Sequence, residues 1–137
     1  GKIEGKLMDF DLVTEKKNQA FVLDAIQKGL IASAHDCAEG GLAVAVTESA
    51  FGKDLGVNVT FDLPKEELFS ETQSRFVLSV KPENQVAFEA LAGDFATKVG
   101  EVTASGELNI QAKDGVIQTK TQTAKQLWEG AIACLLK

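Results

Sequence analysis

The sequence predicts an α+β domain in which about four helices cover an antiparallel or mixed sheet of about six strands. Three observations lead to this class. Apolar residues recur with helical spacing in four segments, and short β-branched or aromatic runs lie between them. An Asp-Gly pair joins two of these runs as a hairpin. The chain is long enough to bury a core, so we expect residues 1–137 to form a single domain.

The first helix is predicted at residues 14–28. Thr14 is a suitable N-cap, and Gly29 follows the helix where a left-handed C-terminal cap is expected. The preceding stretch has no clear period, so residues 1–13 are expected to form an extended lead-in. A strand at residues 30–35 then leads into a turn with two glycines.

The middle of the chain continues with alternating helices and strands. Residues 76–80 are nearly all apolar, which predicts a strand in the centre of the sheet. Pro82 suits the first position of the next helix, which Gly93 ends. The inward face of that helix is expected to contain Val86, Ala87, Phe88 and Leu91. The other strands are expected at residues 57–61, 96–102, 108–112 and 116–119, and a buried helix at residues 42–50.

The last helix is expected to begin at Thr123 and to bury an apolar stripe. Its spacing places Trp128 in the core rather than on a surface that stacks on bases. The stripe consists of Leu127, Trp128, Ala131, Ile132 and Leu135.

Charge and composition exclude several classes of protein. The net charge of −6 argues against a nucleic-acid surface, which needs a basic field. No apolar run is long enough for a membrane helix. Cys37 and Cys134 are too few for a disulfide scaffold, so we expect a cytoplasmic protein with reduced thiols and Cys37 as a buried filler.

The segment His35-Asp36-Cys37-Ala38-Glu39-Gly40-Gly41 carries the first candidate site. A strand, a glycine turn and a helix start direct backbone N–H groups at one point, which favours a phosphate there. The carboxylates of Asp36 and Glu39 would repel a bare phosphate, so their presence predicts a magnesium ion between them and the phosphate. His35 could donate to the same group. The alternative is a simple turn in which a His-Asp pair ties down the loop.

Arg75 belongs to the second candidate site, a polar segment over residues 68–75. It precedes an apolar strand, where its planar guanidinium is well placed to bind a phosphate. The alternative is an ion pair with Glu71, with Ser70 or Thr72 capping a turn. The pattern alone does not separate the two.

These segments resemble a known enzyme family. The residues from His35 to Leu42 resemble the HD-x-S-D/E-GGL motif of the AIR-synthase-like superfamily, with Ala38 in place of the usual serine. Residues 69–76 and 128–136 are similar to phosphoribosylformylglycinamidine synthase in its small bacterial form. The likeness runs from about Asp9 to Lys137 and covers only the last domain of that subunit. It implies an AIR-synthase-like C-terminal domain that is a fragment of a longer chain.

The resemblance implies a carbon–nitrogen ligase of de novo purine biosynthesis. This family converts formylglycinamide ribonucleotide to its amidine, with ATP and Mg²⁺ as cofactors and glutamine as the source of ammonia. The implied partners are upstream domains of the same subunit, a glutaminase subunit and a small accessory subunit, without nucleic acid or membrane. The isolated domain is expected to be inactive. The alternatives are another enzyme of the superfamily, such as AIR synthase or a small-molecule kinase, and a structural docking module without a ligand site.

The resemblance also assigns residues. No catalytic residue is established, and His35 is the one candidate. Asp36 corresponds to the metal-binding aspartate of the motif, and Glu39 is the second carboxylate that we expect at the metal. The substrate or phosphate contacts are expected from Gly40, Gly41, Glu71, Ser74 and Arg75.

Overall fold

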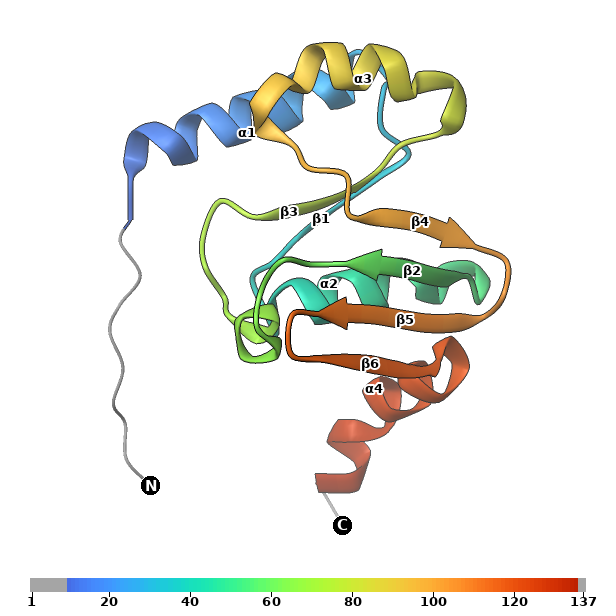
Figure 1. Ribbon diagram of the computed structural model, residues 1–137. Helices are drawn as coiled ribbons and strands as arrows, with labels where there is room; N and C mark the ends of the chain where they lie inside the picture. The colour runs from blue at the N-terminus through green and yellow to red at the C-terminus, as the bar shows by residue number, and fades with distance from the viewer. Residues whose placement is uncertain (1–9, 136–137) are drawn as a thin grey trace.

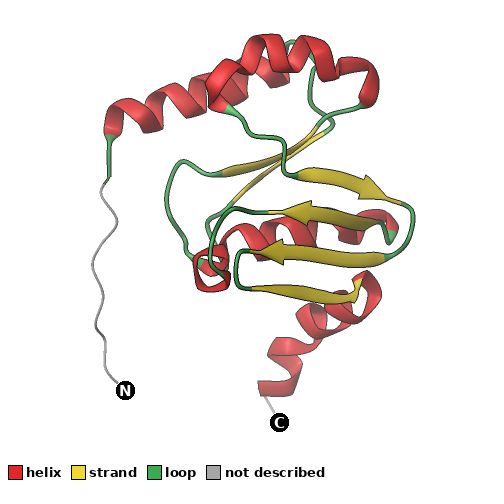
Figure 2. Ribbon diagram, viewed as in Figure 1, coloured by secondary structure: helices red, strands yellow, loops and turns green. Residues whose placement is uncertain are grey.

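The α+β class is confirmed by the structure, a computed structural model that describes residues 10–135 (Figures 1 and 2). No helix within this range is long and apolar enough to cross a membrane. In chain order the elements are α1 (Leu12–Gln27), β1 (Ser33–Asp36), α2 (Gly41–Ala50), η1 (Phe51–Lys53), β2 (Gly56–Thr60), η2 (Lys65–Phe69), β3 (Phe76–Ser79), η3 (Pro82–Asn84), α3 (Gln85–Ala92), η4 (Gly93–Phe95), β4 (Gly100–Thr103), β5 (Glu107–Ala112), β6 (Gly115–Lys120) and α4 (Thr121–Leu135).

The six strands of the described chain divide into two sheets. A four-stranded sheet has the order β4-β2-β5-β6, with β2 and β5 parallel and the other neighbours antiparallel. A separate antiparallel ribbon pairs β1 with β3 and crosses between this sheet and the pair of helices α1 and α3 (Figure 1). The ribbon carries both candidate segments at one of its ends.

The four-stranded sheet is covered on one face by α2 (Figure 2). Val57 and Ile110 point into the main apolar cluster together with Val46 of the helix. The opposite face is polar, and there the Asn109 side-chain amide donates to the Asn58 side chain at 3.0 Å. This alternation is typical of a sheet with one face in the core and one face in water. The predicted burial of this helix is also confirmed.

The apolar strand β3 is not central, contrary to its prediction. Among the strands of the described residues it pairs only with β1, and all of its residues are partly exposed. Val77 packs against the main cluster, whereas Leu78 packs against a second cluster around Ala25 and Phe88. The strand is apolar on both faces because each face contacts a different cluster. The apolar composition of β3 therefore reflects two faces that are covered by other residues, and it does not indicate a strand with a neighbour on each edge.

The N-terminal cap of α1 differs from its prediction, whereas the C-terminal glycine cap is confirmed. The N-cap is Asp11 rather than Thr14, because the Asp11 carboxylate accepts hydrogen bonds from the Val13 N–H and from the Thr14 hydroxyl. Gly29 has a φ of +66° and donates to the Ile26 carbonyl, as a left-handed cap does. Most of the predicted lead-in at residues 1–13 lies outside the described residues, and its last two residues belong to α1.

Other predicted boundaries shift by a few residues. The strand predicted at residues 96–102 begins later, at Gly100, where a Cβ would lie 2.0 Å from the Asn58 carbonyl oxygen. The Asp-Gly hairpin is confirmed between β5 and β6. In α3, Phe88 is buried as predicted, but Val86 is 80% exposed and does not face inward.

The stripe on α4 is exposed, contrary to prediction. The helix begins at Thr121, whose fully buried hydroxyl donates to the Leu55 carbonyl. Trp128 is 58% exposed and packs edge-on against the Phe51 ring, at 5.9 Å between ring centroids. Leu127 and Ile132 are exposed as well, and the side chain of Leu135 lies outside the described ones.

A pair of substitutions distinguishes the true core from this exposed stripe. Leu108→Ala is expected to lower the free energy of unfolding by about 2–5 kcal/mol, because Leu108 is almost wholly buried. Trp128→Ala removes more atoms but should cost only about 0.5–1.5 kcal/mol, the value of one aromatic contact. Urea unfolding followed by circular dichroism measures both. A larger loss for Trp128→Ala would place the tryptophan in the core.

Candidate functional site

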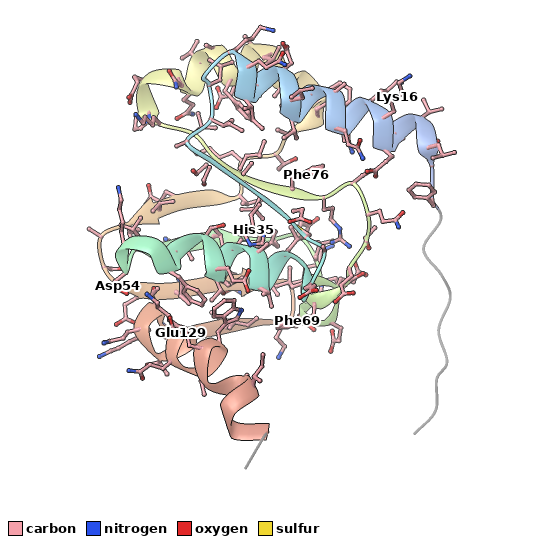
Figure 3. All side chains as sticks on the ribbon, turned by 180° about the vertical axis from the view of Figure 1, so that it is seen from behind. Lys16, His35, Asp54, Phe69, Phe76 and Glu129 are labelled. Carbon is pink, nitrogen blue, oxygen red and sulfur yellow. The ribbon has the colours of Figure 1, made fainter. Side chains whose placement is uncertain are left out.

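The two candidate segments meet at one end of the β1–β3 ribbon. The register pairs Asp36 with Phe76, and the next hydrogen bond runs from the Cys37 N–H to the Arg75 carbonyl at 3.2 Å. Three residues after Cys37, the Gly40 N–H donates to the Glu71 carboxylate at 3.0 Å. Residues more than thirty positions apart therefore form one corner at the start of α2, between the labelled His35 and Phe69 (Figure 3).

The glycine turn is required by a close backbone approach. Gly40 and Gly41 have φ values of +73° and +68°, which glycine adopts at little cost. A Cβ on Gly41 would lie 2.7 Å from the carbonyl oxygens of Leu68 and Ser70. The start of α2 therefore lies directly against residues 68–70, and only glycine fits at position 41.

Glu71 occupies the start of α2. Its carboxylate accepts the Gly40 N–H at the positive end of the helix dipole, where a negative group is stabilised. The alternative of an ion pair between Glu71 and Arg75 is not present among the described contacts. The hydroxyls of Ser70 and Thr72 instead bond to each other at 2.9 Å.

Arg75 is the only arginine of the chain. Its Nε atom is buried and has no hydrogen-bond partner in the described part of the chain. A buried donor without an acceptor costs free energy, so this atom indicates a place for an anion or another acceptor. Arg75 also lines a cleft of about 820 Å³ that runs between the ribbon, α1 and the sheet.

Ser74 shows a feature that the sequence did not indicate. It has a φ of +63°, which is rare for a residue other than glycine. Its hydroxyl donates to the Glu15 carboxylate, and its carbonyl accepts from the Asn18 side chain at 3.2 Å. Both partners lie on α1, more than fifty positions away, and no local pattern could have revealed them.

The two predicted metal ligands are at the surface. The Asp36 side chain is 66% exposed, and Glu39 is exposed too. Among the described residues no three acidic, histidine or cysteine side chains converge on one point. Magnesium is often held by one or two carboxylates plus phosphate oxygens and water, so two carboxylates fit an ion that arrives with a nucleotide.

His35 has both ring nitrogens engaged. Nδ1 lies 2.6 Å from the Asp36 carbonyl oxygen, and Nε2 lies 2.9 Å from the Glu48 carboxylate. Both partners are acceptors, so the protonated imidazolium satisfies both at once. The bond to the Asp36 carbonyl, helped by Glu48, raises the pKa of His35 above its usual value, although partial burial opposes this. In this arrangement the residue ties β1 to α2, and proton transfer would require release of Glu48.

The stability of the protein is expected to fall as the pH rises through the His35 titration. Because the folded-state pKa is raised above the unfolded value of 6.5, the stabilisation is complete below pH 6.5 and is lost above the raised pKa. Urea unfolding on both sides of this window measures the change, and His35 is the only histidine. The matched variant Glu48→Gln should reduce the slope in part, because the bond from His35 to the Asp36 carbonyl remains. An unchanged slope in Glu48→Gln would show that the contact between His35 and Glu48 does not contribute to the pH dependence of stability.

Cys37 behaves as the predicted filler. Its side chain is buried in the main cluster, and burial raises the pKa of the thiol, although Arg75 opposes the rise. A protonated, buried thiol is a poor nucleophile. Cys37 therefore contributes packing to the site rather than chemistry.

Comparison with known proteins gives one family and one fold. The chain matches the family described as "AIR synthase related protein, C-terminal domain" over residues 4–113. Similar solved structures from Thermotoga maritima include PurL complexed with FGAR, with 23% identity and a TM-score of 0.71 over 83% of this chain and 21% of that one. PurLQS shows 24% identity and a TM-score of 0.72 over 85% and 22%. PurL complexed with ADP shows 25% identity and a TM-score of 0.70 over 83% and 22%. The chain thus spans about a fifth of the length of those chains.

Proposed function

This chain belongs to the AIR synthase related proteins and carries their C-terminal domain, and we propose that it serves a phosphoribosylformylglycinamidine synthase. In this role it would supply phosphate contacts for the ATP-dependent conversion of formylglycinamide ribonucleotide to its amidine. The single observation that carries the proposal is the corner where the two motif segments meet. There the start of α2 lies beside an arginine whose Nε atom has no acceptor among residues 10–135.

The chemistry of this corner suits a phosphoryl group. Phosphoryl transfer depends on positioning and on neutralising negative charge more than on covalent help from the protein. A guanidinium binds phosphate oxygens through several parallel hydrogen bonds, and the Nε donor of Arg75 has no partner within the described chain. ATP is the proposed cofactor, and Mg²⁺ would bind between its phosphates and Asp36 or Glu39. The Thermotoga maritima structures with ATP and ADP support a nucleotide in this family fold.

The exposed face of α4 supports a role within a larger assembly. Leu127, Trp128 and Ile132 together expose an apolar stripe, which is unusual for a helix that works alone in water. We propose that upstream domains of the same subunit complete the site, and that a glutaminase subunit and a small accessory subunit deliver ammonia in the cytoplasm. The multisubunit PurLQS structure supports this arrangement. The 137 residues would then be one domain of a longer synthase.

Ammonia-dependent ADP release with formylglycinamide ribonucleotide tests the proposal. The proposed upstream domains are assayed with and without this chain, and we expect turnover only in the mixture. Arg75→Ala and Asp36→Ala should then each reduce turnover while circular dichroism shows an intact fold.

The other outcomes identify the alternatives. Activity without this chain would make it a structural module, as would full activity of both variants. Turnover only with a different substrate, such as a thiamine phosphate or a precursor of aminoimidazole ribonucleotide, would assign the chain to another enzyme of the superfamily.

A further inference from the structure

We propose that Glu15 and Asn18 of α1 are positioning residues that hold the peptide before Arg75 and thereby aim its guanidinium. The inference rests on the proposed phosphate contact of Arg75 and names the residues that make this contact possible. Neither residue belongs to a motif, and both lie on a helix far from the site in sequence. They stand one helical turn apart, on the partly buried face of α1.

The backbone of Arg75 is held on both sides of its Cα atom. The carbonyl of Ser74, in the preceding peptide, accepts from the Asn18 side-chain amide at 3.2 Å. The carbonyl of Arg75 itself accepts from the Cys37 N–H at 3.2 Å. With both peptides fixed, only the side-chain torsions of Arg75 remain free. Arg75 is thus oriented before any anion binds, so less conformational entropy is lost on binding.

The conformation of Ser74 needs this support. Its φ of +63° is unfavourable for a side chain with a Cβ, so surrounding contacts must stabilise it. The hydroxyl of Ser74 donates to one oxygen of the Glu15 carboxylate. The other oxygen accepts from the side chain of Gln19, which orients the carboxylate from within α1. Loss of Glu15 or Asn18 should therefore let the Ser74 peptide relax and release Arg75.

The single arginine makes the test direct. In a ¹H–¹⁵N spectrum of the chain, one Nε–Hε signal belongs to Arg75 without further assignment. We expect slow exchange of this proton with water, because the atom is buried, and a saturable shift when inorganic phosphate is added. Glu15→Ala and Asn18→Ala should each speed the exchange and weaken phosphate binding by about five- to tenfold, the effect of one lost hydrogen bond.

The matched control is Asp24→Ala. It removes one carboxylate from the same helix, but the partner of Asp24 is Lys28 on the surface. This variant should keep the wild-type exchange rate and phosphate affinity. The proposal is overturned if Glu15→Ala and Asn18→Ala behave like Asp24→Ala. A purely structural role would lower the unfolding midpoint without changing the exchange of the Arg75 proton in the folded state.

Two further outcomes keep the proposals separate. If phosphate does not move the wild-type signal, the proposed phosphate contact fails, while the exchange rates still decide whether α1 positions Arg75. If Glu15→Ala does not fold, Ser74→Ala removes the same hydrogen bond from its other end. Unchanged exchange in folded Ser74→Ala would then overturn the role of Glu15.

Discussion

Gly41→Ala is expected to lower the free energy of unfolding by about 2–5 kcal/mol, the sum of a left-handed backbone penalty and of overpacking. The added Cβ would lie 2.7 Å from the backbone carbonyl oxygens of Leu68 and Ser70. Backbone atoms of η2 cannot turn away as a flexible side chain can. The start of α2 or residues 68–70 must therefore move, and the candidate site would open with them. Urea unfolding followed by circular dichroism measures the loss.

The matched control is Gly29→Ala, which separates the two penalties. Gly29 has nearly the same φ, +66°, but no non-adjacent residue in the described range 10–135 lies within 4 Å of its added Cβ. Only the backbone term remains there, and we expect a loss of about 1–2 kcal/mol. Equal losses at the two positions would show that the close approach of η2 to α2 does not constrain the fold.

Arg75→Ala is expected to weaken phosphate or ADP binding by about 10- to 100-fold, as removal of hydrogen bonds from a charged donor does. Arg75→Lys should recover little of this affinity, because an ammonium group cannot place a donor at the buried Nε position. Isothermal titration with ADP measures the change. The stability of Arg75→Ala should remain close to that of the wild type, since a buried donor without an acceptor contributes no hydrogen bond to the fold.

Lys81→Ala serves as the control for charge. It also removes one positive charge, from just beyond the other end of β3, where Lys81 lies at the surface beside Glu83. We expect ADP affinity to be unchanged. Equal weakening in Lys81→Ala and Arg75→Ala would attribute binding to the general field and not to the guanidinium.

The elements could be predicted from the sequence because they depend on neighbours along the chain. The glycine cap at Gly29, the proline at the start of η3 and the hairpin between β5 and β6 were recognised from local patterns. The pattern predicts Thr14 as the N-cap, whereas the side-chain hydrogen bonds make Asp11 the N-cap. Boundaries of this kind depend on single hydrogen bonds that a pattern does not show.

Burial was harder to predict than periodicity. The stripe on α4 has the spacing of a buried face, yet Trp128 and its neighbours are exposed in this chain. The run in β3 has the composition of a central strand, yet its faces contact two clusters and no strand of the described chain pairs with its outer edge. Periodicity indicates which residues share a face, but it does not indicate what covers that face.

The sequence by itself determined the α+β class, the glycine turn and the two polar segments, because spacing and residue type are local properties. Only the tertiary structure decided that the Gly40 N–H meets Glu71, that no described residue accepts from Arg75 Nε, and that α1 holds Ser74. The hydrogen bonds of Gly40 and Ser74 join residues more than thirty positions apart. Their geometry depends on how the ribbon, α1 and α2 pack together, and no pattern within one segment contains that information.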